Sequence, residues 1–204
     1  YNETQGRGIL PTPAIGGVGL IDDVAKSVGI AFARAGDSII LVGETAGWLG
    51  QSMYLWQVCG REEGAPPPVD LLAERRNGDA VRALILSGHV KACHDLSDGG
   101  LAIALAEMAM AGCVGAVIDP APAAIPAHAY WFGEDQARYL LSCAPQDAQA
   151  VLDALAKAGA PALRIGTTGG DSLQLGADAP ISIAELASSH EGWLPNFMRG
   201  ETTI

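Results

Sequence analysis

The chain has 204 residues, of which 49% are hydrophobic, so it is long enough to bury the core of one ordinary domain. Its formal net charge is −11, whereas a protein that binds nucleic acid usually has a basic face, so we expect no nucleic-acid partner. No stretch approaches the roughly 18 apolar residues of a membrane helix, so we expect no membrane partner either. The four cysteines form no CxxC pair, which favours buried thiols in the cytoplasm over a structural zinc site.

Short apolar runs, most of them bounded by glycine or proline, predict the strands. They are expected over residues 38–42, 90–93, 114–118, 137–143, 162–165 and 172–175. Residues 6–19 are instead rich in glycine and proline, and they predict an irregular connection. Helical segments separate most of the strands, and two strands follow one another near the end. This order predicts an α+β fold, a layered α/β sandwich with a mixed sheet.

Apolar periodicity and capping residues predict the helices. They are expected over residues 50–58, 70–87, 98–112, 145–159 and 182–195, with a short turn of helix near residue 128. We expect Asn77 and Gly78 to divide the second of these, and Ser97 and Asp98 to cap the third. A capping box formed by Ser182 and Glu185 is expected to start the last helix, and Pro195 is expected to end or kink it.

The stretch HDLSDGG at residues 94–100 lies at a strand-to-helix junction, where free N–H groups attract anions and glycines let a ligand approach the backbone. Asp95 and Asp98 offer the hard oxygen ligands that Mg²⁺ prefers, and His94 could act as an acid or a base near neutral pH. Alternatively, Ser97 and Asp98 only cap a helix. The candidate binding residues are His94, Ser97, Asp98, Gly99 and Gly100, with Asp95 as the candidate metal ligand.

A second polar stretch, FGEDQAR at residues 132–138, stands at the entrance to a predicted strand. Its side chains could bind a polar ligand, with Arg138 holding a carboxylate or a phosphate through two parallel hydrogen bonds. Alternatively, it is a solvated turn with an exposed ion pair, which would contribute little to stability. Glu134, Asp135 and Gln136 are the candidate binding residues of this stretch.

The glycines of the stretch PTPAIGGVG at residues 11–19 could cradle a phosphate, which makes Gly16 and Gly17 further candidates. The stretch lacks the spacing of a P-loop and of a dinucleotide-binding fingerprint, so a plain connection between domains is the alternative. From the residues alone, the chain is an α/β domain with a candidate phosphate or Mg²⁺ site.

Six motifs together resemble the last quarter of the phosphoribosylformylglycinamidine synthase family, and they occur in that family's order. They are YNET at 1–4, PTPAIGGVG at 11–19, HDLSDGGL at 94–101, FGEDQAR at 132–138, IGTTGG at 165–170 and HEGWLP at 190–195. The resemblance implies a sandwich like the C-terminal domain of PurM, with a central mixed sheet that is partly ferredoxin-like. It assigns residues 1–35 to the end of a preceding nucleotide-binding domain and the connecting segment. Residues 36–204 would be the AIR synthase-related C-terminal domain.

The resemblance also implies a function for the parent enzyme, which amidates formylglycinamide ribonucleotide with ATP, Mg²⁺ and ammonia released from glutamine by a glutaminase domain or subunit. The family's catalytic histidine lies outside this chain, so the fragment is expected to be inactive and to need no cofactor of its own. The resemblance also relates this domain, by pseudo-symmetry, to the equivalent domain in the first unit of the synthase. In that comparison, Asp95 matches a metal ligand. Glu134, Asp135 and Gln136 match the start of a substrate-binding stretch in which Ala137 replaces a glutamate. Expected partners are the remaining synthase domains, the glutaminase and, for the fragment, a second copy of itself. The alternatives are a domain of another PurM-like enzyme, such as aminoimidazole ribonucleotide synthase, and a non-catalytic interaction module.

Overall fold

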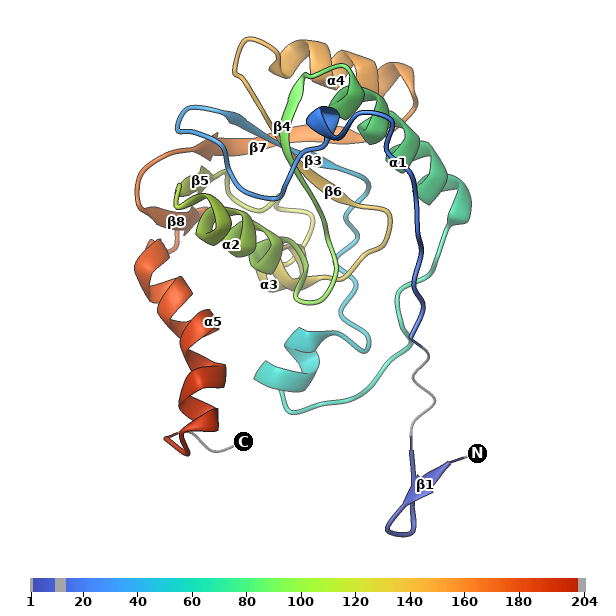
Figure 1. The fold of residues 1–204 in the computed structure, drawn as a ribbon, viewed down its shortest axis with the longest axis vertical. Helices are drawn as coiled ribbons and strands as arrows, with labels where there is room; N and C mark the ends of the chain where they lie inside the picture. The colour runs from blue at the N-terminus through green and yellow to red at the C-terminus, as the bar shows by residue number, and fades with distance from the viewer. Residues whose placement is uncertain (1, 10–13, 202–204) are drawn as a thin grey trace.

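A seven-stranded mixed sheet forms the centre of the computed structural model, which describes residues 2–9 and 14–201 (Figure 1). The strands are β3 (Ser38–Val42), β4 (Val90–Asp95), β5 (Ala116–Ile118), β6 (Tyr139–Cys143), β7 (Ala162–Thr168), β8 (Ser172–Leu175) and β9 (Ile181–Ser182). They lie in the order β4-β6-β3-β7-β5-β8-β9, and only β5 and β8 run parallel. The α+β fold with a mixed sheet is thereby confirmed.

The sequence of β3, SIILV, explains its central place in the sheet. All five residues are buried, since successive side chains point to opposite faces and both faces are covered. Ile39 and Leu41 join one apolar cluster, whereas Ile40 and Val42 join the other. The sheet therefore has one hydrophobic core on each of its two faces.

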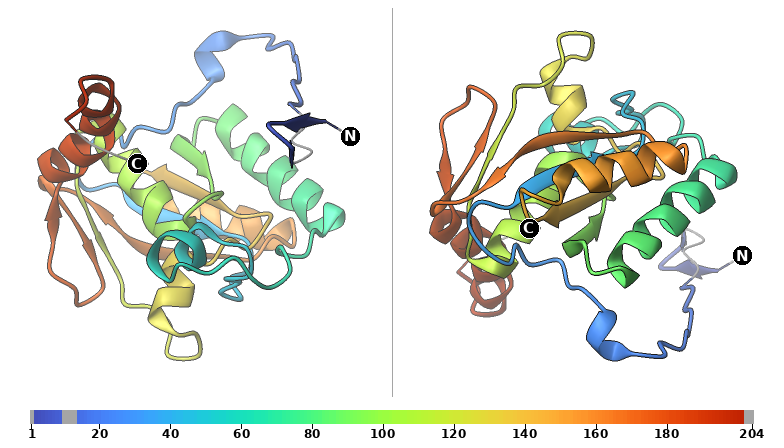
Figure 2. Two further views of the ribbon diagram at one scale, coloured as in Figure 1. Left: turned by 90° about the horizontal axis from the view of Figure 1, so that it is seen from below. Right: turned by 90° about the horizontal axis from the view of Figure 1, so that it is seen from above.

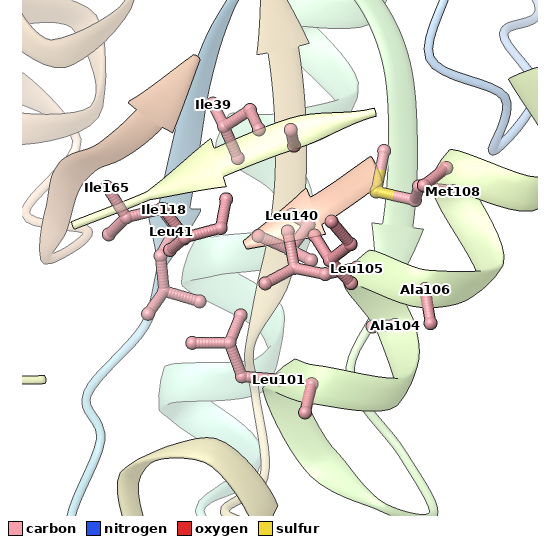
Figure 3. Packing of buried hydrophobic residues seen from close by; sticks show 14 of the residues in the cluster. Ile39, Leu41, Leu101, Ala104, Leu105, Ala106, Met108, Ile118, Leu140 and Ile165 are labelled. Atoms are coloured by element: carbon pink, nitrogen blue, oxygen red, sulfur yellow. The ribbon is translucent and has the colours of Figure 1, made fainter. Parts of the chain in front are cut away.

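Helices cover both faces of the sheet (Figure 2). The helices α1 (Leu71–Leu86) and α4 (Ala148–Lys157) pack on one face, where Val81 and Leu155 are among the buried residues. On the other face lie α2 (Gly100–Gly112), α3 (Ala127–Phe132) and α5 (Ile183–Met198). Figure 3 shows the core beneath α2, where Leu101, Leu105 and Met108 point at the sheet.

The described residues before β3 form an arm that begins away from the body of the molecule and then runs onto it (Figure 1). Its outer part holds a two-stranded hairpin of β1 (Glu3–Thr4) and β2 (Arg7–Gly8), followed by a 3₁₀ turn, η1 (Val24–Lys26). Its last part packs on the body, because Phe32 is buried and its N–H donates to the carbonyl of Met108 on α2. The N–H of Cys93, on the edge strand β4, donates to the carbonyl of Gly29. Tyr1 and residues 10–13 and 202–204, which include part of the expected connection, lie outside the described residues.

Three helix predictions were wrong in detail. First, α1 is continuous through Asn77 and Gly78, because Asn77 is buried and its Nδ2 donates to the carbonyl of Ala137, 2.9 Å away. Second, α4 begins at Ala148 rather than near Pro145. Third, α5 does not end at Pro195 but runs to Met198 with that proline inside it.

The start of α2 corrects a further prediction. Its N-cap residue is Gly99 at φ 78°, and neither Ser97 nor Asp98 caps the helix with its side chain. By contrast, the cap predicted for α5 is confirmed, since Ser182 accepts the N–H of Glu185 at 3.1 Å. A five-residue π-helix, η2 (Tyr54–Val58), occupies the segment predicted as a short helix. Within the part of the chain that the structure describes, no helix is long and apolar enough to cross a membrane.

Candidate functional site

The two polar stretches singled out in the sequence meet at one cavity. Strand β4 pairs antiparallel with β6, which places Asp95 opposite Tyr139 and brings the stretch after β4 beside the stretch before β6. The cavity has a volume of about 280 Å³. Its lining residues are Glu74, Asp95, Leu96, Ser97, Asp98, Glu134, Gln136, Ala137, Arg138 and Tyr139. Four of the predicted binding residues, Ser97, Asp98, Glu134 and Gln136, therefore share one site with the candidate metal ligand Asp95.

Glu134 is the residue that joins the elements around this cavity. Its side chain is buried, and Oε1 accepts the backbone N–H of Gly99 at 2.8 Å and that of Met53 at 2.8 Å. The first N–H lies at the start of α2, where helix N–H groups lack intrahelical partners, so Glu134 supplies the cap that Ser97 and Asp98 do not. A carboxylate predicted to bind a ligand is thus engaged in holding a helix and a loop.

Asp135 and Arg138 have a similar structural role. Asp135 accepts the N–H groups of Gly47 at 3.0 Å and Trp48 at 3.3 Å, which fixes the loop after β3. Arg138 is 1% exposed, and its Nε donates to the carbonyl of Asp135 at 3.1 Å. Burial lowers the pKa of Arg138, while the charge of Asp135 opposes that shift. Neither side chain is positioned to bind a ligand as its main partner.

The exposed acids and Gln136 are the groups that can face a ligand. The side chain of Asp95 is 69% exposed, and Asp98 and Gln136 are also exposed. Gln136 makes one hydrogen bond, from its Nε2 to the carbonyl of Glu134 at 3.2 Å. These three side chains form the accessible wall of the cavity.

The charge of the cavity decides which ligands it can attract. Among the described residues, four carboxylates line it, from Glu74, Asp95, Asp98 and Glu134, whereas Arg138 is the one cation in its lining. Such a surface repels a bare phosphate and favours cations or hydrogen-bond donors such as hydroxyl groups. The sequence had not singled out Glu74, which accepts a hydrogen bond from the hydroxyl of Tyr139 at 2.5 Å. Burial, together with that bond, raises the pKa of Tyr139.

His94 faces away from this cavity. Its Nε2 lies 2.8 Å from Glu107 Oε2 on α2, and its Nδ1 lies 3.3 Å from Asp95 Oδ1. It lines a separate cavity of about 350 Å³, together with His190 on α5. The structure therefore does not bring His94 to the other predicted binding residues, although it connects His94 to Asp95.

The predicted glycines divide into two groups. Gly99 and Gly100 have φ values of +78° and +64°, and a Cβ on Gly100 would lie 2.4 Å from the carbonyl oxygen of Gly133. Gly100 therefore allows the close approach of α2 to the end of α3, whereas a Cβ on Gly99 would lie 2.3 Å from the side chain of Ile103. Gly16 and Gly17 are exposed, with nothing within 4 Å of an added Cβ, and they do not line the cavity.

A second cavity, of about 340 Å³, adjoins the first and shares Gln136 and Ala137 with it. Trp48 and Arg76 are among its lining residues. Ala137, on the ridge between the two cavities, has φ +59°, a left-handed conformation that costs a non-glycine residue about 1–2 kcal/mol. Periodicity could not have identified this ridge, because it depends on the contact between Asn77 and the carbonyl of Ala137.

The donor atoms around these cavities decide whether a metal ion or a nucleotide could bind there. Among the described residues, no three His, Cys, Asp or Glu side chains are grouped so that they could hold a metal ion. Asp95 alone offers too few ligands for Mg²⁺, which needs near-octahedral coordination by oxygen. The described residues consequently do not form a self-sufficient site for Mg²⁺ or for nucleotide phosphates.

Comparisons with known proteins place these features in context. The family model "AIR synthase related protein, C-terminal domain" matches residues 34–176. Phosphoribosylformylglycinamidine synthase subunit PurL from Methylocella silvestris is 61% identical over 198 residues, which are 97% of this chain and 27% of that relative. Two solved structures of Thermotoga maritima PurL each match 80% of this chain at 18% sequence identity. The structure complexed with FGAR has a TM-score of 0.67, and the match covers 30% of its chain. The structure complexed with ATP has a TM-score of 0.64, and the match covers 28% of its chain. The solved structures show the shared fold, and the chain spans 27% of the length of the curated relative.

Proposed function

The chain belongs to the family of AIR synthase related proteins, as their C-terminal domain, and we propose that it is the part of a phosphoribosylformylglycinamidine synthase that forms one wall of a composite site. The whole synthase would be an ATP-dependent C–N ligase that amidates formylglycinamide ribonucleotide in purine biosynthesis. The 61% identity over nearly the entire chain supports this assignment.

The observation that carries the proposal is the incomplete cavity between β4, α2 and β6. Glu134 is occupied by two backbone N–H groups, while Asp95, Asp98 and Gln136 remain exposed at the rim. Such a wall can orient the hydroxyl groups of a nucleotide or contribute one ligand to a shared Mg²⁺ ion, but it cannot hold either alone. In our proposal, Asp95 is that one ligand, and Ser97, Asp98 and Gln136 are polar contacts.

The remaining roles follow from the same proposal. Glu134, Asp135, Gly99 and Gly100 keep the wall in shape, and His94 orients Asp95. Gly16 and Gly17 lie on the segment that joins this domain to a preceding nucleotide-binding domain, at the proposed boundary between residues 1–35 and 36–204. ATP and Mg²⁺ would bind mainly to that preceding domain, and ammonia would come from a glutaminase partner. The four free thiols support our placement of the synthase in the cytoplasm.

A chimera tests the assignment. The 198 matching residues of Methylocella silvestris PurL are replaced by the corresponding residues of this chain, and ATP-dependent amidation of formylglycinamide ribonucleotide is measured with ammonia as the nitrogen source. We expect activity in the chimera and none in the isolated chain. A folded chimera that does not amidate the ribonucleotide would refute the assignment. Turnover by the isolated chain would refute the composite site.

An active-site variant sharpens the test. In the active chimera, Asp95→Asn should raise the Mg²⁺ concentration needed for half-maximal rate, if this carboxylate is a shared ligand. The matched control is Asp79→Asn, an exposed carboxylate on the outer face of α1. An unchanged Mg²⁺ requirement in the Asp95 variant would remove Asp95 from the proposed ligands.

A further inference from the structure

The outward face of α2 is unusually apolar for a surface helix. Ile103, Glu107, Met110 and Ala111 follow one another at helical spacing and form one stripe, in which Ile103 and Ala111 are exposed while Glu107 and Met110 are half-buried. Glu107 is the only charged residue in the thirteen of this helix, and Ile103 is 42% exposed. A helix that is hydrophobic all round is normally buried on every side, yet α2 leaves Ile103 and Ala111 exposed.

Hollows flank this stripe on both sides. The first, of about 370 Å³, lies toward η2 and is lined by Met53, Tyr54, Gln57, Val58, Ile103 and Phe132, among others. The second, of about 350 Å³, lies toward α5 and the arm. Glu107 lines both hollows, so the two hollows adjoin on one surface of the molecule.

The walls of this surface are shaped by aromatic residues. Tyr54 stacks on Phe132 with ring centroids 5.2 Å apart, and on His128 at 5.7 Å, which holds η2 against α3. On the two elements that flank α2, Trp56 of η2 is 51% exposed and Trp193 of α5 is 47% exposed, although neither residue lines the hollows. Exposed aromatic and apolar side chains around a concave patch are typical of a protein–protein contact.

We propose that this α2 face, defined by the α2 stripe, η2 and α5, binds the remainder of the synthase polypeptide. The inference rests on the proposed function, and it deepens that function by naming the contact surface. The chain is 27% of the length of its PurL relative, so most of the parent polypeptide is available to cover the face. The family model ends at residue 176, whereas the PurL match covers 97% of the chain and so extends into α5. The helix α5 therefore lies within the match to PurL but outside the match to the AIR synthase related family model.

Charge indicates the chemistry of the partner surface. Among the described residues that line the two hollows, the carboxylates are Asp98, Glu107 and Glu191, and the other titratable groups are Tyr54, His94 and His190. A partner that is apolar opposite Ile103 and carries Lys or Arg opposite Glu107 would match this surface. A second copy of this chain fits less well, because its net charge of −11 would place acidic surfaces together.

Hydroxyl-radical footprinting of Met110 tests the proposal. Its oxidation rate is measured in the isolated chain and in the full-length chimera described above. We expect the rate in the chimera to fall at least about threefold, because a side chain at the core of an interface loses most of its accessible area. The variant Ile103→Glu should return the rate to that of the isolated chain. The matched control is Leu72→Glu on α1, 82% exposed on the opposite side of the sheet, and it should leave the protection of Met110 intact.

The outcomes separate the two proposals. An active chimera with unprotected Met110 overturns the docking face and leaves the assigned function standing. An inactive chimera with protected Met110 supports the docking face and overturns the assigned function. Protection of Met110 in the isolated chain that increases with chain concentration would show that a second copy covers the face, and it would overturn the assignment to the parent polypeptide.

Discussion

Replacing Glu134 tests whether this side chain holds the candidate site together. In Glu134→Ala, the N–H groups of Gly99 and Met53 both lose their acceptor. An unsatisfied buried donor costs about 1–3 kcal/mol, so the pair should cost about 2–6 kcal/mol of unfolding free energy. The N–H of Gly99 should account for the larger share, because it is buried while that of Met53 is partly accessible. The isosteric Glu134→Gln keeps an acceptor oxygen but loses the charge, and it should cost about 1–3 kcal/mol.

Urea unfolding of the 204-residue chain, followed by circular dichroism, measures these costs. The midpoint should fall in the order wild type, Glu134→Gln, Glu134→Ala, with an unchanged dependence of free energy on urea concentration. Gln136→Ala is the matched control, since this neighbouring side chain is exposed and its loss should change stability by less than about 0.5 kcal/mol. If Glu134→Ala proves as stable as the control, the carboxylate does not hold α2, and its role must be sought in ligand binding.

Three further variants probe the wall and the core by urea unfolding. Gly100→Ala should lower the unfolding free energy by about 2–5 kcal/mol, because the position has a positive φ and an added Cβ would touch backbone atoms. Gly16→Ala should leave stability unchanged, since nothing lies within 4 Å of an added Cβ. Equal effects of the two changes would contradict the assigned roles. Asn77→Ala should lower the unfolding free energy by about 1–2 kcal/mol, because the carbonyl of Ala137 loses its hydrogen-bond donor. The control Asp79→Ala, in the same helix, should change stability by less than about 0.5 kcal/mol. A neutral Asn77→Ala would refute the reasoning. Burial raises the pKa of the Cys143 thiol to about 11, above its ordinary 9.0, so the unfolded chain releases this proton first and stability falls as pH rises from about 9 to 11. Between pH 9 and 11, the unfolding free energy of wild type should therefore fall by up to about 3 kcal/mol more than that of Cys143→Ala. An equal fall in the two proteins would exclude the thiol as a cause.

Local patterns allowed much of the fold to be predicted from the sequence. The buried run at residues 38–42 stands between glycines, and the capping box that begins at Ser182 uses contacts three residues apart. The two polar stretches were recognisable for the same reason, since each lies at a junction between predicted elements. The cap of α2 was not predictable in this way, because Glu134 reaches Gly99 from 35 residues along the chain. Asn77 likewise gives no local sign that its partner is a carbonyl 60 residues away.

The contact between the arm and β4 bears on how this domain can be isolated. Strand β4 is an outermost strand of the sheet, and an edge strand with free N–H and C=O groups readily recruits strands from other molecules. Gly29 occupies part of that edge by accepting the N–H of Cys93, and Phe32 is buried nearby against α2. A protein cut at residue 36, the boundary that the sequence suggests, would lose both residues. It would carry a bare strand and an emptied apolar slot, and it should precipitate at concentrations where a protein beginning at residue 28 stays in solution.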